Sequence, residues 1–384
     1  MADRLAGVRI APYTTLRLGG PARAFAAADS AAELVELVAA ADRAGEPVLL
    51  LGGGSNLVVA DAGFDGLVVR VASRGVEVRQ DGDRVTVTAQ AGEDWDALVA
   101  RTVAEGWSGV ECLSGIPGSV GSTPIQNVGA YGQEVAQTVA AVRVYDRATG
   151  ELLDLPAERC GFAYRHSAFK ADPGRHVVLS VTYRLARSAE SGPIAYQELA
   201  TRLGVRAGER VPLRDARAAV LRLRRGKGMV LDAADPDTCS AGSFFTNPIL
   251  TAAEAAELEL RAPGFPRWPM PDGAVKVPAA WLIEHAGFAK GYRRGPARIS
   301  TKHTLALTNP GGLGVTGPAT DPEALAGAGP QSDGLPGDGL PGPAGEAPAT
   351  TADLLALARE VRDGVRAKFG VTLVNEPVLV GAGL

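Results

Sequence analysis

Hydrophobic and polar residues follow two different patterns in the N-terminal part of the chain: short apolar runs and apolar residues at helical spacing. A short apolar run at 25–28 predicts a strand, and apolar residues along one helical face predict a helix over 30–45, with Ser30 and Glu33 as its capping box. The apolar segment 47–54 predicts a buried strand that runs into a glycine turn. Together these elements predict a β-α-β unit that opens an α/β domain.

The same kinds of apolar pattern continue through most of the remaining chain. Alternating or continuous apolar residues predict strands, and apolar residues at helical spacing predict helices, one of which has Thr251 and Glu254 as a capping box. The expected strands lie within 66–71, 84–92, 139–155, 176–185 and 371–381, and the expected helices cover 93–106, 213–225, a segment from 251 onward and 351–370.

Residues 311–349 break this pattern. The segment is rich in glycine and proline and has almost no large apolar side chain. Such a composition buries too little surface to offset the conformational entropy lost on ordering, so we expect a disordered loop inserted into a folded domain.

Composition narrows the classes of function. The chain has 384 residues and a formal net charge of −4, so no basic field favours binding to nucleic acid or to an anionic membrane. The N-terminus lacks the apolar core of a signal peptide, and no apolar run reaches the roughly 18 residues of a membrane helix. Because Cys112, Cys160 and Cys239 form neither a disulfide framework nor a zinc pattern, we expect core thiols in a reducing cytoplasm and no metal site.

Two glycine-rich loops are candidates for ligand binding. In LGGGSNLVVAD, residues 51–61, successive glycines let backbone N–H groups approach an anion, although an ordinary tight turn has the same composition. The loop is not the dinucleotide fingerprint, because Leu57 stands at the third glycine position and a strand follows. The loop at 113–135 has five glycines but few charges, which favours a pyrophosphate or an isoalloxazine edge, with an irregular core crossover as the alternative.

Four further positions carry polar groups suited to catalysis. The fixed fork of Arg165, in YRHSAFK, suits a carboxylate or an enolate oxygen, with a solvated face that includes Lys170 as the alternative. Lys227 between two glycines suits a phosphate. Glu376 is expected inside an apolar strand, where a carboxylate is costly without a partner, unless it faces water at a sheet edge. Ser243, in SAGSFFTNP, lacks the second glycine of a nucleophile elbow, which leaves its chemistry open.

Taken in order, eight segments of the chain resemble motifs of the UDP-N-acetylenolpyruvoylglucosamine reductases, flavoproteins that make UDP-N-acetylmuramate for peptidoglycan. The resemblance covers residues 12–381 apart from the insert, and YRHSAFK with an intact 185–230 region resembles the type I branch. The eight segments are TTLRLGGPA, LGGGSNLVV, SGIPGSVGSTPIQNVGAYGQEV, YRHSAFK, RRGKGMVLD, GSFFTNP, WLIEHAGFAKG and NEPVLVG.

The resemblance implies an α+β fold class: a three-domain flavoprotein with an FAD-binding fold of the vanillyl-alcohol-oxidase type and a C-terminal α/β substrate domain. Residues 1–70, completed by 370–384, would form the first FAD-binding subdomain, and 71–228 would form the second. Residues 229–369 would form the substrate-binding domain, with the 311–349 insert. A cytoplasmic monomer is also implied.

The resemblance further implies which residues hold the ligands. FAD would be bound non-covalently, because all four histidines lie outside both glycine loops, and NADPH would be a co-substrate. Substrate contacts would come from Tyr164, Tyr196, Lys227 and Asn247, whereas His285 is left out of the site. The implied FAD-binding residues are Gly52, Gly53, Gly54, Ser55, Asn56, Ser114, Gly115, Ile116, Pro117, Gly118, Gln126, Asn127, Gly129, Ala130, Tyr131 and Gly132.

The implied reaction, that of a UDP-N-acetylmuramate dehydrogenase, has two halves. NADPH reduces FAD and leaves, and the enolpyruvyl ether of UDP-N-acetylglucosamine then receives hydride from reduced FAD at its terminal vinyl carbon. Negative charge develops at C2 and spreads into the carboxylate, where Arg165 and a protonated Glu376 would stabilise the enolate. Ser243 would protonate C2 as a general acid, so it needs no Ser-His-Asp base.

Two other functions stay open when the residues are taken alone. An FAD oxidase or dehydrogenase acting on an alcohol or a sugar would need a base rather than a proton donor, and it would not need NADPH. A non-catalytic nucleotide-sugar binder would have lost at least one of Ser243, Arg165 and Glu376, and all three are present.

Overall fold

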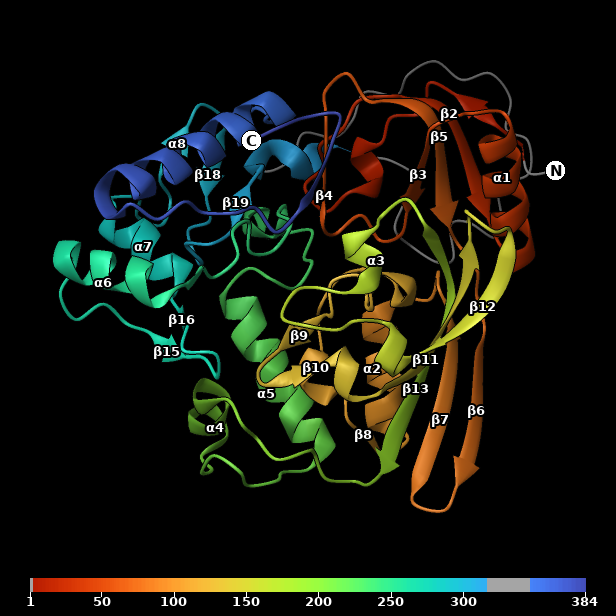
Figure 1. The fold of residues 1–384 in the computed structure, drawn as a ribbon, viewed down its shortest axis with the longest axis horizontal. Coiled ribbons are helices and arrows are strands. Elements are labelled where there is room, and N and C mark those ends of the chain that lie inside the picture. The colour runs from red at the N-terminus through yellow and green to blue at the C-terminus, as the bar shows by residue number, and fades with distance from the viewer. Residues whose placement is uncertain (1–2, 316–345) are drawn as a thin grey trace. The chain divides into compact units, whose positions relative to one another are not determined.

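The computed structural model describes residues 3–315 and 346–384, which form two compact units (Figure 1). Each unit is assembled from segments that are distant in the sequence. The first unit comprises the chain up to Val8, then Ala22–Gly53 and Asp65–Gly226. The second unit comprises Arg9–Pro21, Gly54–Phe64 and Lys227–Leu384.

The larger sheet of the first unit is antiparallel, with strand order β12-β11-β13-β7-β6 and β8 also paired to β13. Alternation along β7 buries Val85, Val87 and Ala89, and α2 (Trp95–Ala104) packs on the same core, with the Trp95 ring centroid 5.7 Å from that of Tyr183. The strands are β6 (Val76–Asp81), β7 (Arg84–Gln90), β8 (Trp107–Ser108), β11 (Val139–Asp146), β12 (Glu151–Pro156) and β13 (His176–Arg187).

The smaller sheet of the first unit contains the predicted β-α-β unit. Its strand order is β1-β2-β5-β3, with β3 parallel to β5, and Leu34 and Val38 of α1 are buried against it. The elements are β1 (Leu5–Ala6), β2 (Ala22–Ala28), α1 (Ala31–Arg43), β3 (Val48–Leu51) and β5 (Phe64–Val71).

The capping box predicted for α1 is half right. The Ser30 hydroxyl accepts the N–H of Glu33 at 3.1 Å, as predicted. The Glu33 carboxylate, however, accepts the N–H of Asp29 at 2.9 Å instead of the N–H of Ser30. The carboxylate therefore satisfies the amide one residue earlier, while the hydroxyl still satisfies an N–H of the first helical turn.

The rest of the first unit consists of short elements and two helices. The amphipathic helix α5 packs against α4 through Val220 and Leu199. These elements are η2 (Glu111–Leu113), η3 (Val120–Ser122), β9 (Gly129–Ala130), β10 (Gln133–Glu134), η4 (Val135–Gln137), η5 (Ala157–Arg159), α3 (Ala168–Ala171), α4 (Gln197–Leu203) and α5 (Leu213–Gly226).

The second unit is built around α8 (Thr351–Phe369), which buries Leu354 and Val361 with Phe244 and Phe245 in one core. Gly370 ends the helix in the left-handed conformation, with φ 75°, as the sequence predicts. The other elements are η1 (Ala11–Tyr13), β4 (Leu57–Val59), η6 (Pro236–Thr238), β14 (Ile249–Leu250), α6 (Ala252–Arg261), β15 (Trp268–Pro269), β16 (Val275–Lys276), α7 (Ala279–His285), β17 (Arg293–Arg294), β18 (Ala297–Ile299), β19 (Leu307–Thr308), η7 (Pro310–Gly314) and β20 (Val378–Val380).

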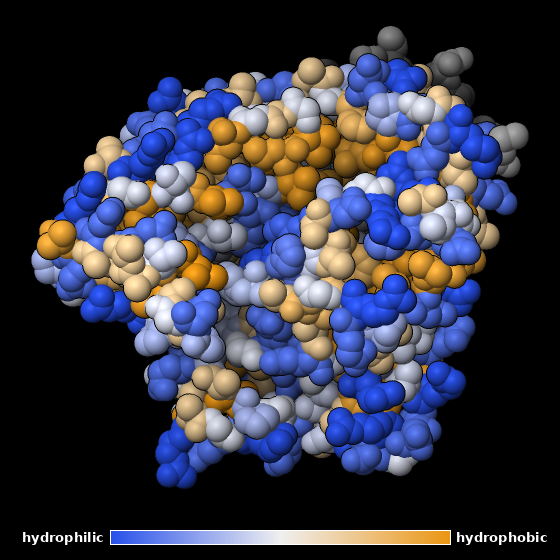
Figure 2. All heavy atoms as spheres, in the orientation of Figure 1, coloured by the Kyte–Doolittle hydropathy of each residue, from blue (hydrophilic) through white to orange (hydrophobic). Residues whose placement is uncertain are grey.

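Helix α8 has the two-sided character of a helix at a protein surface. Figure 2 shows hydrophilic residues over much of its visible outer side, while its other side contributes to the core. Within residues 3–315 and 346–384, no helix combines the length and the apolar character that crossing a bilayer requires.

The strand predicted over 371–381 is much shorter in the structure. Only β20 is a strand, and it pairs in parallel with β4, so that Val378 lies opposite Leu57. Glu376 precedes Pro377, which has no N–H to donate to a ladder. The prediction that Glu376 lies inside a strand is therefore wrong.

The segment 311–349, predicted to be disordered, lies only partly within the described residues. Residues 316–345 lie outside the described residues, but η7 and Ala349 are placed at its two ends. The buried Asn309 side chain accepts the N–H of Ala349 at 2.8 Å and donates to the Leu16 carbonyl at 3.0 Å. The buried Asn309 side chain therefore fixes the chain at Ala349, inside the segment for which composition predicted disorder.

We expect Asn309→Ala to lower the free energy of unfolding by about 3 kcal/mol, because two buried backbone groups lose their partner. Urea unfolding followed by circular dichroism measures this change. Asn309→Asp keeps an acceptor for Ala349 but loses the donor to Leu16. Its free energy of unfolding should therefore lie between those of the unaltered protein and of Asn309→Ala. An unchanged unfolding midpoint for Asn309→Ala would contradict this account.

Candidate active site

The first glycine loop leaves β3 at Leu51 and is closely packed on both sides. A Cβ atom on Gly52 would lie 2.5 Å from the Ser119 hydroxyl, and a Cβ atom on Gly53 would lie 2.5 Å from the Cα of Gly118. These contacts, all within the first unit, place the two predicted glycine loops against each other. A side chain at either position would clash with the second loop, so both positions require glycine. An ordinary tight turn has no such neighbour.

The loop continues into the second unit at Gly54, which also has no room for a side chain. Its φ is 60°, and a Cβ atom there would lie 2.0 Å from the Tyr13 carbonyl oxygen. Asn56 then pairs with the C-terminal segment: its carbonyl accepts the N–H of Val378 at 2.9 Å, and its side chain donates to the Glu376 carbonyl at 3.4 Å. Asn56 and Glu376, two predicted site residues, are thus neighbours.

The second glycine loop contains left-handed backbone at residues other than glycine. Asn127 and Tyr131 have φ of 47° and 49°, and Arg165 has φ of 52°. Such conformations are strained for residues with side chains and persist only where the surroundings hold them, which is common at functional sites.

Hydrogen bonds join the second glycine loop to the segment that carries Arg165. The Asn127 amide nitrogen donates to the Glu134 carboxylate at 2.8 Å and to the Ala163 carbonyl at 3.1 Å. The Arg165 guanidinium donates to the Gly129 carbonyl at 2.9 Å. The loop therefore orients Arg165 from two sides, through its backbone turn and through its side chain.

Three tyrosines of the first unit surround this region. The rings of Tyr131 and Tyr196 meet edge to face with centroids 5.6 Å apart, and the Arg165 guanidinium lies 5.5 Å from the Tyr164 ring centroid. Burial raises the pKa of Tyr131 to about 12, so its hydroxyl stays protonated at neutral pH. Tyr196 is half exposed, which suits a residue that contacts a ligand.

Arg224 is a candidate site residue that sequence reasoning missed. It is buried in α5, and burial lowers its pKa to about 10, with Tyr131 and Asp96 opposing that shift and Arg165 adding to it. The signal was available in the sequence: Leu213, Ala216, Val220 and Arg224 follow the buried face of α5. An arginine in that apolar stripe indicates a buried cation.

In the second unit, Ser243 and Glu376 are brought together by backbone pairing. The N–H of Glu376 donates to the carbonyl of Phe244 at 2.8 Å, and the N–H of Thr246 donates to the carbonyl of Val374 at 3.0 Å. Ser243 directly precedes Phe244, so the predicted proton donor is adjacent to the residue paired with Glu376. Backbone pairing thus brings together two segments that are more than a hundred positions apart in the chain.

The contacts of the other predicted substrate residues in the second unit do not by themselves indicate a ligand site. The Asn247 side chain accepts the N–H of Ala279 at 2.9 Å and so caps the start of α7. Lys227 follows the end of α5 and is partly exposed. His285, which the sequence analysis left out of the site, stacks on Trp281 with ring centroids 4.0 Å apart.

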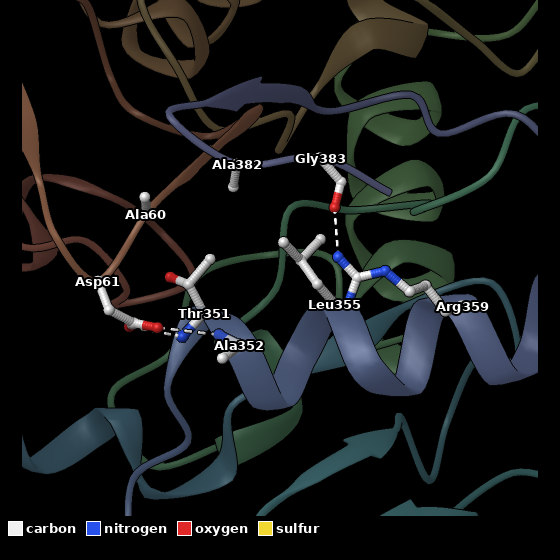
Figure 3. Close-up of a pocket in the computed structure, with 8 residues that line it drawn as sticks. All are labelled: Ala60, Asp61, Thr351, Ala352, Leu355, Arg359, Ala382 and Gly383. Atoms are coloured by element: carbon white, nitrogen blue, oxygen red, sulfur yellow. Dashed lines mark hydrogen bonds between the residues drawn. The ribbon is translucent and has the colours of Figure 1, made fainter.

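A pocket of about 220 Å³ in the second unit contains none of the predicted site residues (Figure 3). Asp61 accepts the N–H groups of Thr351 and Ala352 at 2.8 and 2.9 Å, and Arg359 donates to the Gly383 carbonyl at 2.5 Å. The Asp61 carboxylate already pairs with the free N–H groups at the start of α8. The polar groups of this pocket therefore serve helix capping. Its lining residues are Ala60, Asp61, Thr351, Ala352, Leu355, Arg359, Ala382 and Gly383.

Comparison with known proteins assigns the chain to a family. Residues 22–156 match the family described as FAD binding domain, and residues 235–321 match the C-terminal domain of UDP-N-acetylenolpyruvoylglucosamine reductase. The protein named UDP-N-acetylenolpyruvoylglucosamine reductase from Salinispora arenicola is 56% identical over 97% of this chain and 94% of its own length. The chain belongs to the UDP-N-acetylenolpyruvoylglucosamine reductase family.

Further members of this reductase family support the assignment. The reductase of that name from Thermobifida fusca is 54% identical over 98% of both chains. The crystal structure of the Thermus caldophilus reductase matches 99% of each chain with a TM-score of 0.61 and 25% identity. The predicted family, the α+β class with its FAD-binding fold, and the assignment as an oxidoreductase are confirmed, whereas the three-domain division stays a prediction.

The glycine loops fit the FAD that this reductase family requires. Glycine at 52 and 53 lets the two loops pack against each other, and glycine-rich backbone can present its N–H groups to a phosphate. The three cysteines are buried and free, and burial raises the pKa of Cys112 to about 12, which makes its thiol unreactive. Among the residues that the structure describes, no group of three His, Cys, Asp or Glu side chains is placed to hold a metal ion.

We expect Gly53→Ala to weaken FAD binding by about 100-fold, because overpacking against the Gly118 backbone costs up to ~3 kcal/mol. Titrating flavin-free protein with FAD and following the quenching of flavin fluorescence measures the dissociation constant. Gly45→Ala is the control, since a Cβ atom at Gly45 meets nothing within 4 Å and its left-handed strain is local to the end of α1. Equal FAD affinity for both variants would show that the glycine loop does not bind the cofactor.

Proposed function

We propose that this chain reduces the enolpyruvyl ether of UDP-N-acetylglucosamine to UDP-N-acetylmuramate with NADPH, through non-covalently bound FAD, in peptidoglycan precursor synthesis. The observation that carries the proposal is identity above 50% over nearly the whole length of relatives named for this reduction. The backbone hydrogen bond between Glu376 and Phe244, the residue that follows Ser243, supports the proposal.

The proposal gives each reactive side chain one role. FAD held by the two glycine loops would supply the hydride chemistry, with NADPH as the proposed reductant. Arg165, held by Gly129, supplies fixed positive charge to the substrate carboxylate as negative charge develops at C2, and Glu376 in its protonated form donates to the same group. Ser243 gives a proton to C2.

The remaining contacts hold the substrate and the cofactor. Tyr164, Tyr196, Lys227 and Asn247 are proposed to contact the sugar nucleotide. The buried Arg224 adds positive charge near Arg165 and Tyr131, which favours an anionic substrate group in that region. The FAD contacts are proposed to come from 52–56, 114–118, Gln126, Asn127 and 129–132.

Absorbance spectroscopy tests the proposed reaction. Purified protein should show flavin bands that NADPH bleaches without oxygen and that UDP-N-acetylenolpyruvoylglucosamine then restores, with UDP-N-acetylmuramate as product. After acid precipitation the yellow colour should stay in the supernatant, because FAD is not covalently attached. Bleaching by an alcohol or a sugar instead of NADPH would indicate the alternative oxidase.

A further inference from the structure

The first turn of α2 holds the second glycine loop at three points. The Trp95 indole N–H donates to the Leu113 carbonyl at 3.3 Å, and the Trp95 backbone N–H donates to the Gly118 carbonyl at 3.0 Å. Between them, the N–H of Gly115 donates to the Asp96 carboxylate at 2.6 Å. Two adjacent residues of one helix thus hold positions 113, 115 and 118 of the loop.

Asp96 is itself held by a second helix. Arg217 of α5 donates to both Asp96 oxygens, at 2.6 and 2.9 Å, in the bidentate geometry that fixes a carboxylate most rigidly. Burial alone would raise the pKa of Asp96, but the hydrogen bonds from Arg217 and from Gly115 lower it, so the carboxylate is ionised at neutral pH. A charged acceptor makes the bond from Gly115 stronger than a neutral one would be.

The held segment needs such support. Gly115 and Gly118 have φ of 72° and 129°, and glycine at such angles has much conformational entropy to lose. The segment also ends where it contacts the first glycine loop. A Cβ atom on Gly53 would clash with Gly118, and one on Gly52 would clash with Ser119. Its position therefore decides how the two loops approach a ligand.

We propose that Asp96, oriented by Arg217, is a positioning residue for FAD that holds the 115–118 loop in its cofactor-binding conformation. The inference rests on the proposed role of this loop in the reductase and extends it to residues outside the loop. Asp96 touches neither the cofactor nor the substrate in this account. It acts by preventing the Gly115 amide and its neighbours from reorienting when FAD is absent.

The chain offers a matched control in a second bidentate pair of the first unit. Arg147 donates to both oxygens of Asp42 in α1, at 3.1 and 2.5 Å, without a loop amide on the carboxylate. The side chains of Asp42 and Arg147 are 27% and 23% exposed, against 32% and 18% for Asp96 and Arg217. Removing either aspartate therefore breaks a comparable ion pair, but only one removal releases a glycine loop.

The experiment compares FAD dissociation constants, measured by flavin fluorescence on full-length protein stripped of FAD, with thermal midpoints of the same samples. Asp96→Ala should weaken FAD binding about 10- to 100-fold, the loss expected for one charged hydrogen bond. Asp42→Ala should lower the thermal midpoint similarly and change FAD affinity less than about twofold. Asp96→Asn keeps an oxygen for Gly115 and should bind FAD more tightly than Asp96→Ala.

A charge reversal separates positioning from helix pairing. Asp96→Arg combined with Arg217→Asp restores an ion pair between α2 and α5 but leaves Gly115 without an acceptor. The thermal midpoint should recover while FAD affinity stays low. Recovery of FAD affinity in this double variant, or an Asp96→Ala affinity within about twofold of the unaltered protein, would overturn the proposal. Because no substrate is used, a failure of the proposed reductase activity would show separately, as absence of turnover in unaltered protein loaded with FAD.

Discussion

Replacing Ser243 by alanine is expected to slow the second half-reaction by roughly 10²- to 10⁴-fold, because the enolate loses its proton donor. Flavin reduction by NADPH should be almost unchanged, since that half-reaction transfers no proton to C2 of the substrate. Single-turnover stopped-flow measures both halves separately: NADPH bleaches the flavin, and the substrate is then mixed with the reduced protein. The ratio of the two rates, rather than the overall rate, is the decisive quantity.

The control for Ser243→Ala is a neighbouring hydroxyl in the same segment. Ser240 is buried and accepts the N–H of Gly242 at 3.2 Å, so Ser240→Ala disturbs the backbone next to Ser243 without removing the proposed acid. We expect it to affect both halves by a similar small factor. If Ser243→Ala slows both half-reactions alike, the serine has a structural role and the assignment as general acid is wrong.

Replacing Arg165 by lysine is expected to slow the second half-reaction by about 10²- to 10³-fold, the usual loss when one preorganised electrostatic group is removed. Lysine keeps the charge but lacks the planar fork, and it cannot both reach Gly129 and face a carboxylate in two directions. The affinity for the enolpyruvyl substrate should fall as well, because a carboxylate is bound in the ground state too.

FAD affinity separates the catalytic role of Arg165 from its contact with the glycine loop. Arg165→Lys should bind FAD within about threefold of the unaltered protein, because the loop has other anchors in Asn127 and Asp96. Arg175→Lys breaks a comparable guanidinium–carboxylate contact with Asp146 and should leave both half-reactions unchanged. A loss of FAD binding that matches the loss of turnover would assign Arg165 to the loop instead of to the enolate.

The order of short motifs was enough to determine the family, the cofactor and most of the local structure. Helix ends at Thr251, Thr350 and Gly370 depend on residues within four positions of one another, so capping and periodicity encode them directly. The same locality explains the errors. Pro377 interrupts the predicted final strand, so that only Val378–Val380 pair as β20, and Asn309 fixes Ala349, 40 residues further along the chain.

Only the tertiary structure decided which distant groups meet. The pairing of 244–246 with 374–376 brings the residue after Ser243 against Glu376 in the second unit, and the paired Thr246 and Val374 are 128 residues apart. Arg217 and Asp96 are 121 residues apart, and no local pattern indicates that they bind. Such contacts depend on how helices and strands pack, which periodicity does not specify. The sequence therefore predicted candidate site residues, while the fold decided which distant groups contact them.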